Sequence, residues 1–295
     1  MTIPSTVEAL RELPAQRASH SLLEIIDLET GHRSVLKEFD QVIEAPNFTP
    51  DGYFIYYNSL GRMHRIEVAT GHIDPVDTGF AVDCNNDHLL SPDGQHLAVS
   101  HFDHADVCSR IYILPANGGD PVQVTTLGPS YLHGWSPDGQ RLAYCAQRQG
   151  QYDIYTIAVQ GGPEQRLTDT PGLDDGPEYS PDGQHIWFNS TRSGLMQIWR
   201  MDADGGHPKA LFPQAANCWF PHVSSDGRWV SYVAYAEHDV NPDQHPPDRW
   251  VELHVAPACG GTPRVLASLY GGQGTMNVNS WSPDSRHLAF VSYRP

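Results

Sequence analysis

The chain has 295 residues, of which 39% are apolar and 18% are charged. Its 35 acidic and 18 basic side chains give a formal net charge of -17 at pH 7. Such a surface repels the phosphates of nucleic acids and anionic lipids, so we expect no nucleic-acid partner and no membrane partner. The 26 Gly and 24 Pro residues, with few helical patterns, predict many turns and mostly β structure.

The N-terminal residues and the cysteines favour a cytoplasmic protein. Residues 1–20 carry several charges and no apolar run of the length that a signal peptide needs. These residues match no later part of the chain, so we expect a leader over 1–20 and a single domain over 21–295. Five Cys residues are scattered without a C-x-x-C pair, which is typical of free thiols in a reducing compartment.

A four-residue turn recurs along the chain and divides it into units. It reads Ser-Pro-Asp-Gly at 91–94, 136–139 and 180–183, and weaker copies stand at 49–52, 224–227 and 282–285. Its six Asp residues (51, 93, 138, 182, 226 and 284) are 42, 45, 44, 44 and 58 positions apart, a period typical of four strands per repeat. Proline fixes φ, Asp accepts backbone hydrogen bonds and Gly takes a positive φ, so each copy predicts a hairpin turn.

The units begin in the middle of a repeat. Residues 21–38 have two short apolar runs around Glu29-Thr30-Gly31, the pattern of the third and fourth strands of later units. Five full units, with strands A to D, are predicted at about 44–77, 86–125, 131–168, 175–212 and 219–267. In the fifth unit 33 residues separate Gly227 from Gly260, against 22 between Gly183 and Gly205, which indicates a polar, Pro-rich B–C insertion over 237–248.

The end of the chain supplies the missing half unit. Residues 277–292 have the pattern of a first and a second strand around the last turn. Strands 21–38 can therefore pair with strands 277–292 and close a ring, which leaves no open sheet edge. The sequence predicts an all-β, six-bladed β-propeller with four antiparallel strands per blade.

The repeated segment resembles the WD40-like (PD40) repeat of the TolB propeller family. The resemblance covers about 21–293 and rests on S-P-D-G-x-x-[IL]-[AW]-[FYV], an I-Y-x-[IM]-type strand, a G-G-x-P turn and Arg166-Leu167-Thr168. It implies a six-bladed propeller. TolB itself has a signal sequence and a separate N-terminal domain, which we do not expect here, so its role in the Tol system is not carried over. Oligogalacturonate lyases, propellers with a His-bound metal in the channel, also look related.

Strand A of each blade lines the central channel, and the D–A and B–C connections share one face, where sites of this fold class usually lie. We expect ligand-binding residues near that face, on the strand A that precedes each recurring turn. The candidates lie three or five positions before the Ser or Thr of the turn, or next to such a position. They are Asn86, His88, His133, Asp174, Asp175, Glu178, Trp219, His222, Asn277 and Asn279. Alternate residues of a strand share a face, so the two aligned sets are expected to point the same way. Each of these residues can equally be a buried polar group that only satisfies the backbone or channel water.

Two functions from different classes fit this sequence. The first is a cytoplasmic binding module with a protein, small-molecule or carbohydrate ligand at the channel mouth. The alternative is a metal-assisted carbohydrate lyase or hydrolase, with a divalent metal held in the channel by His88, His133 and His222. Two further clusters, His101–Asp106 and the His and Asp residues of 237–248, are either metal ligands or solvated loops. The sequence identifies no catalytic residue and leaves open whether the protein is an enzyme.

Overall fold

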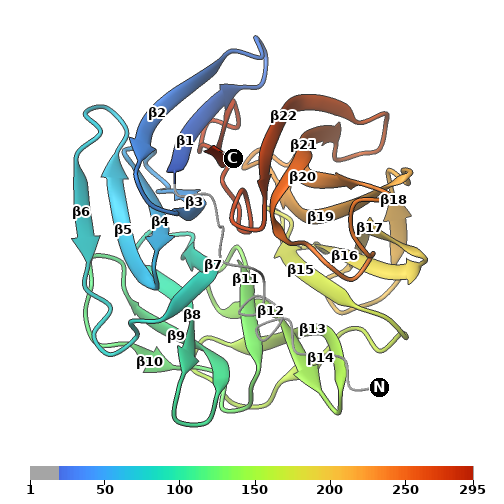
Figure 1. Cartoon of the computed structure of the whole chain (residues 1–295). Coiled ribbons are helices and arrows are strands. Elements are labelled where there is room, and N and C mark those ends of the chain that lie inside the picture. Colours follow the sequence, from blue (N-terminus) through green and yellow to red (C-terminus); the bar gives the residue numbers. More distant parts are fainter. Residues whose placement is uncertain (1–19, 295) are drawn as a thin grey trace.

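Residues 20–294 are described here from a computed structural model of the chain. Six small antiparallel sheets stand around a central axis like blades (Figure 1). These residues form strands and turns and contain no helix, so none of them forms a helix long and apolar enough to cross a membrane. The all-β six-bladed propeller predicted from the repeats is confirmed. The predicted leader lies outside the described residues, apart from His20, which begins the first strand.

Five blades have four strands each, in chain order from the axis outwards (Figure 1). Blade 1 contains β3 (Glu44–Phe48), β4 (Phe54–Ser59), β5 (Arg62–Glu67) and β6 (Ile73–Val76). Blade 2 contains β7 (Cys84–Leu90), β8 (His96–Asp103), β9 (Cys108–Pro115) and β10 (Val122–Gln123). Blade 3 contains β11 (Ser130–Trp135), β12 (Arg141–Arg148), β13 (Gln151–Ala158) and β14 (Gln165–Arg166). Blade 4 contains β15 (Asp174–Tyr179), β16 (His185–Ser193), β17 (Leu195–Asp202) and β18 (Lys209–Leu211). Blade 5 contains β19 (Ala216–Val223), β20 (Trp229–Ala236), β21 (Pro247–Pro257) and β22 (Arg264–Gly272).

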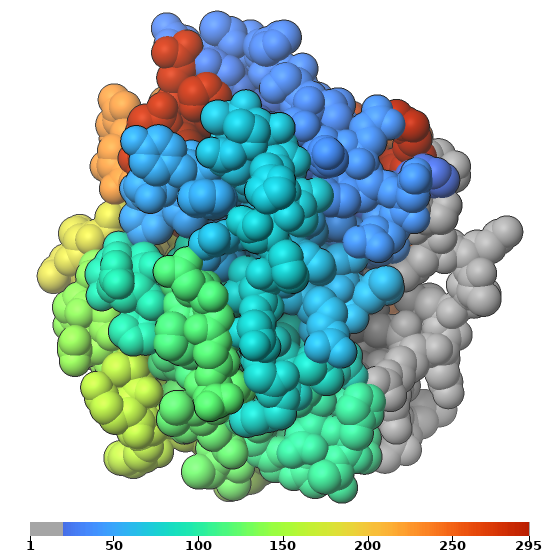
Figure 2. Space-filling view, turned by 90° about the vertical axis from the view of Figure 1, so that its left-hand side faces the viewer, coloured from blue at the N-terminus to red at the C-terminus, as the bar shows by residue number. Residues whose placement is uncertain are grey.

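The sixth blade joins the two ends of the chain. β1 (His20–Asp27) lies between β2 (Arg33–Phe39) and β23 (His287–Arg294), and all eight residues of β1 pair with β23. The segment before β23 contacts it through a single bridge, Trp281 to Leu288, and three backbone hydrogen bonds, so this blade has three regular strands. Figure 2 shows the red C-terminal segment against the blue N-terminal strands. The two ends of the chain therefore close the ring, as the half units predict.

The recurring turn has one hydrogen-bonding pattern in all six blades. Its Ser or Thr hydroxyl donates to the Asp carboxylate two residues later, at 2.6 Å from Thr49 to Asp51 and 2.7 Å from Ser224 to Asp226. The same hydroxyl oxygen accepts the backbone N–H five residues on in every copy. The turn Gly has φ between 69° and 76° in five blades, and Ser285 takes φ 59° in the sixth. The predicted hairpin turns are confirmed.

A β-bulge interrupts the innermost strand of each four-stranded blade. The register with the next strand shifts between Glu44 and Asn47 in blade 1 and at the corresponding place in blades 2 to 5. In blades 1, 4 and 5 the bulged residue is Ala45, Gly176 or Phe220, with φ between 54° and 61°, and a proline follows it. The expectation that residues three and five before the turn share a face is therefore wrong, because the bulge breaks the alternation.

Apolar side chains fill the space between neighbouring blades. Between blades 5 and 6, for example, Trp219 and Leu253 belong to one buried cluster with Ile26 and Phe290. Buried Asn side chains also join blades: the Asn47 side-chain oxygen accepts the Leu90 backbone N–H at 3.1 Å, and that of Asn189 accepts the Phe220 N–H at 3.0 Å. These contacts fix the inner strands relative to each other and so position the channel side chains.

Candidate functional site

The channel mouth is the end of the central channel where the B–C hairpins and the connections between blades lie. Four ionisable side chains gather there from four different segments, and we call them the mouth cluster: Asp87 on β7, His133 on β11, Asp175 on β15 and His245 in the loop between β20 and β21. The first three come from strand A of blades 2, 3 and 4. The cluster therefore depends on the closed ring rather than on any local motif.

His133 and Asp175 form a buried ion pair. His133 Nε2 lies 3.1 Å from Asp175 Oδ1, and the side chains are only 4% and 12% exposed. Burial disfavours the charged imidazole, but its contact with Asp175 outweighs this, so the pKa of His133 is raised above its ordinary value. Burial also disfavours the Asp175 carboxylate, yet His133 lowers the pKa of Asp175 overall. The Asp175 carboxylate is therefore ionised at neutral pH, and the charged form of His133 is favoured relative to a free imidazole.

Asp87 lies beside this ion pair, where burial makes its ionised form unfavourable. Burial raises its pKa to about 7, and the negative charge of Asp175 adds to the effect, while His133 opposes it. The Asn85 side chain donates a hydrogen bond to Asp87 Oδ2 at 2.6 Å. At neutral pH the Asp87 carboxyl is therefore divided between its protonated and ionised forms, and it can either donate or accept a hydrogen bond.

His245 reaches the mouth cluster from the B–C insertion of blade 5. Its ring lies 4.2 Å from that of Trp219 and 5.1 Å from that of Phe220, and Nδ1 contacts the Gln273 side-chain oxygen. Burial lowers the pKa of His245, so its ring is neutral at pH 7. The ring of His133 also stacks on the ring of Phe220, and their centroids are 5.8 Å apart. The aromatic rings thus form a wall beside the ionisable groups.

Three of the residues predicted from the sequence border the mouth cluster. The Asn86 side-chain oxygen accepts a hydrogen bond from Gln273 Nε2 at 3.1 Å, which links β7 to the segment after β22. The Asn277 side-chain oxygen accepts the Gly274 N–H at 2.7 Å, and its Nδ2 has no hydrogen-bond partner. Trp219 stacks against His245 as described above. These residues shape the mouth from blades 2, 5 and 6.

Three other predicted residues form a separate network deeper in the channel. The Glu178 carboxylate accepts from the Val223 N–H, from Asn279 Nδ2 and from His222 Nδ1, each at 2.7 Å. His222 Nε2 also lies 3.2 Å from the Met276 carbonyl oxygen. Both carboxylate oxygens of Glu178 accept hydrogen bonds from residues of other blades. The network therefore joins blades 4, 5 and 6 and offers no free carboxylate oxygen to a ligand.

The remaining two predicted residues are engaged elsewhere. The Asp174 carboxylate accepts a hydrogen bond from Arg192 at 2.8 Å within blade 4. His88 is fully buried beside the backbone of Asn85 and Ala45, and burial lowers its pKa to about 4. His88 is therefore a neutral core residue at physiological pH.

The sequence analysis did not identify Asp87, His245 or Gln273 individually. Asp87 lies four residues before its turn, at the bulge, where alternation gives no guidance. The insertion around His245 was predicted on the correct face, and its loop spans 237–246 between β20 and β21. Its extra length was the available signal, but which of its side chains turns inwards depends on packing against Trp219.

The candidate metal ligands do not form one group. His133 pairs with Asp175, His222 pairs with Glu178, and His88 lies in the core beside the backbone of Asn85 and Ala45. Within residues 20–294 no three His, Cys, Asp or Glu side chains are placed so that they could hold a metal ion. The same holds for the candidate ligands at His101–Asp106 and in the insertion over 237–248. The residues present thus do not fit a resident divalent metal, and no chemistry is derived through one.

Comparison with known proteins identifies the family. A family model described as the TolB beta propeller domain matches residues 88–245, more than half of the chain. The chain belongs to the TolB β-propeller family. Among the relatives of this TolB propeller is an uncharacterised protein of Agrobacterium fabrum, 44% identical over 278 residues that cover 93% of each chain. The resemblance recognised in the repeats is therefore confirmed.

Two further relatives extend the comparison. A solved structure from Agrobacterium tumefaciens, provisionally assigned as TolB, matches this TolB propeller with a TM-score of 0.90 and 43% identity, over 95% of this chain and 100% of the other. The Tol-Pal system protein TolB of Francisella tularensis is 27% identical over 129 residues, which are 42% of this chain and 29% of that protein. The similarity to that TolB thus covers less than a third of its length.

Proposed function

We propose that this TolB-family propeller is a binding module that holds a small polar ligand at the channel mouth. The mouth cluster is the observation that carries the proposal. Ionisable side chains from four blades meet there beside an aromatic wall, a composition typical of small-molecule sites. A structural role alone explains the Glu178 network, where all groups are satisfied, but it does not explain a carboxyl as costly as Asp87.

The chemistry of the cluster suggests a ligand with several hydroxyl groups. Asp87 and Asp175 accept hydrogen bonds from hydroxyls, while the ring N–H of His133 and the protonated form of Asp87 donate them. The buried rings of Phe220 and Trp219 lie behind these polar groups and keep their surroundings apolar. Neutral sugars and uronic acids have this combination of groups.

A thermal-shift and calorimetry panel of neutral sugars and uronic acids tests this proposal. A ligand that binds only the folded protein at 100 times its Kd stabilises it by about 2.7 kcal/mol, which raises Tm by several degrees. We expect His133→Gln to abolish the shift. His254→Gln is the matched control, because His254 is a buried histidine on β21 that pairs with Glu252 away from the mouth. No shift with any sugar, or a shift that survives His133→Gln, contradicts the proposal.

The alternative of a metal-assisted lyase is examined with the same protein. Elemental analysis of material purified without a His tag or chelator measures any bound metal directly. Stoichiometric metal that is lost in His133→Gln would favour the enzyme, despite the absence of a three-residue ligand set within residues 20–294. Metal-free protein leaves the binding module as the proposed function.

We also propose that the protein works in the cytoplasm. All five cysteines are free thiols, and Cys84, Cys145 and Cys218 are buried. Burial raises the pKa of the Cys84 and Cys218 thiols to about 12, so neither is a reactive thiolate. Cell fractionation of the native chain checks the location, and recovery from the periplasm would contradict it.

A further inference from the structure

The opposite end of the channel, which we call the turn face, carries the six recurring turns and a separate cavity. This cavity has a volume of about 410 Å³, and we call it the funnel. Each blade contributes the residue before its turn, namely Phe48, Leu90, Trp135, Tyr179, Val223 and Trp281. Each blade also contributes the second residue of its turn, which is proline in five blades and Ser225 in blade 5. The funnel therefore has apolar residues from all six blades in its walls, and the polar side chains of Asn47, Glu178 and Asn279 also line it.

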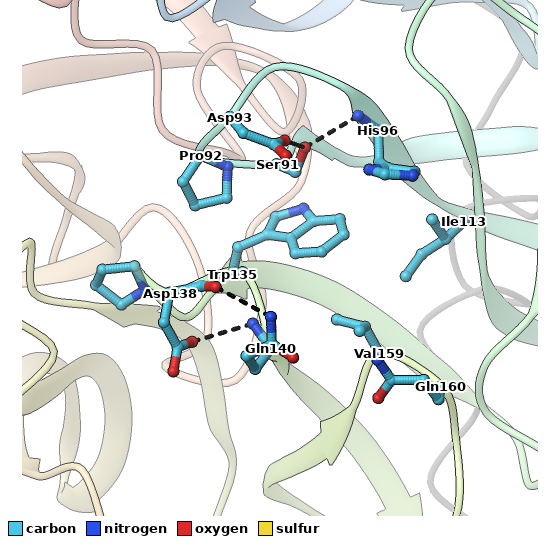
Figure 3. A pocket seen from close by; sticks show the side chains of 12 residues that line it. Ser91, Pro92, Asp93, His96, Ile113, Trp135, Asp138, Gln140, Val159 and Gln160 are labelled. Atoms are coloured by element: carbon cyan, nitrogen blue, oxygen red, sulfur yellow. Dashed lines mark hydrogen bonds between the residues drawn. The ribbon is translucent and has the colours of Figure 1, made fainter.

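A groove between blades 2 and 3 opens from the funnel. It has a volume of about 610 Å³ and shares Ser91, Pro92, Trp135 and Pro137 with the funnel lining. Figure 3 shows Trp135 between the turn that carries Asp93 and the turn that carries Asp138. Funnel and groove thus form one continuous apolar depression that has a carboxylate on each side.

All six turn aspartates are held in their ionised form. In Asp51, Asp93, Asp138 and Asp182 the largest influence is the hydrogen bond from the turn hydroxyl, which lowers the pKa of each carboxyl. In Asp226 and Asp284 burial acts in the opposite direction, but the hydroxyl bonds still lower the pKa overall. The turn that builds the fold therefore also fixes a ring of negative charge around the funnel.

Several of these carboxylates form no ion pair with a basic side chain among the described residues. Arg228 pairs with Asp226, and His287 lies 3.6 Å from Asp284. Within residues 20–294, no Lys, Arg or His side chain forms an ion pair with Asp93 or Asp138. The turn hydroxyl occupies only Oδ1 of each of these carboxylates. The groove between blades 2 and 3 is thus bordered by two carboxylates that form no ion pair among the described residues, although His96 lies near Asp93 and Arg141 lies near Asp138.

We propose that the turn face is a docking surface for a basic protein partner, which inserts apolar side chains into the funnel and places Lys or Arg residues beside Asp93 and Asp138. The apolar walls favour burial of apolar side chains, and the charge of the rim complements basic residues. This surface is independent of the ligand proposed at the channel mouth.

A phage-displayed library of linear peptides, selected on the immobilised full-length chain, tests this proposal. We expect enriched peptides to have an aromatic residue, Leu or Met next to two or more Lys or Arg residues. A synthetic peptide with the consensus sequence then serves as the probe in calorimetry. Its affinity should fall about tenfold between 50 mM and 300 mM salt, because exposed charges are screened at higher ionic strength.

Charge-matched double variants locate the probe on the protein. Asp93→Asn with Asp138→Asn keeps the side-chain oxygens that accept the turn hydrogen bonds and removes two charges; we expect the affinity to fall at least tenfold. Asp239→Asn with Asp243→Asn makes the same charge change in the B–C insertion and should leave the affinity unchanged. Ser225→Arg, at the exposed funnel rim, should also weaken binding.

Three results would overturn the proposal. Enriched peptides without basic residues would remove the charge argument. Equal affinities for the two double variants would show that Asp93 and Asp138 do not contribute. Loss of binding in His133→Gln, with normal binding in the Asp93 and Asp138 double variant, would place the peptide at the channel mouth instead.

Discussion

Asp87 shows how a single residue reveals a special environment. It is 5% exposed, and burial raises its pKa to about 7 from an ordinary value of 3.8. The nearby His133 and a hydrogen bond from Asn85 offset only part of the loss of water around its carboxylate. An apolar residue in its place would avoid this cost, so the carboxyl is more readily explained by binding than by stability.

The first prediction concerns stability against pH. Between pH 3.8 and about 7 the folded state holds the Asp87 proton and the unfolded state does not, so this carboxyl makes the free energy of unfolding fall as pH rises. The whole effect is on the order of 2–4 kcal/mol. In Asp87→Asn, urea unfolding between pH 4 and pH 8 should show a shallower decrease than in the wild type.

The control for this experiment is Asp243→Asn, which changes an exposed aspartate in the insertion. Its stability profile should run parallel to that of the wild type. The raised pKa of His133 acts in the same direction, since the stability that its charged form contributes is lost as pH rises through the folded pKa, so some slope remains in Asp87→Asn. Parallel profiles for Asp87→Asn and the wild type would contradict the assignment.

At the scale of the element, the bulge in strand A decides which side chains enter the channel. Gly176 at the bulge of β15 has φ 61°, and the residues on either side of it serve different networks. Asp175 before the bulge joins the mouth cluster, and Glu178 after it binds His222 and Asn279. The bulge thus separates a candidate site from a structural network within one short strand.

The second prediction concerns this bulge. A Cβ at Gly176 would lie 2.5 Å from Asn189 Oδ1, the atom that accepts the Phe220 N–H from blade 5. Gly176→Ala should therefore lower the free energy of unfolding by about 2–4 kcal/mol, from backbone strain and crowding together. Gly183→Ala is the control, because φ is 70° there but the nearest heavy atom is 3.7 Å away. Its cost should be about 1 kcal/mol, and equal losses measured by urea unfolding would refute the crowding argument.

At the scale of the whole molecule, the ring is closed by strands from both ends of the chain. β1 lies between β2 and β23, and the buried Glu24 on β1 contacts Arg33 on β2 and Ser292 on β23. This carboxylate therefore joins all three regular strands of the closing blade. Since the other five sheets are each continuous in sequence, blade 6 is the one sheet that holds distant parts of the described chain together.

The third prediction concerns closure. Glu24→Gln leaves Arg33 without its charged partner, and because the Arg33 side chain is 34% exposed the expected loss is about 1–3 kcal/mol rather than the full cost of breaking a buried pair. Glu38→Gln removes a carboxylate from the exposed pair with Arg294 in the same sheet and should cost less than about 0.5 kcal/mol. Urea unfolding measures both, and equal effects would mean that Glu24 has no special role in closure.

The sequence by itself determined the number of blades and the way in which the ring closes. Both follow from local chemistry, because the hydroxyl and the Asp of each turn, with a proline in five turns and a Gly in five, act within six residues and the pattern recurs six times. It also predicted the insertion in blade 5 and the face on which it lies, since strand order alone fixes where a B–C loop projects.

Only the tertiary structure decided which side chains meet. The members of the mouth cluster are separated by more than 40 residues along the chain, and strand periodicity cannot align them because each inner strand is shifted by a bulge. His245 reaches the cluster through packing against Trp219, a contact that its own loop sequence does not specify. Turns are fixed by neighbours in sequence, whereas a channel site is fixed by neighbours in space.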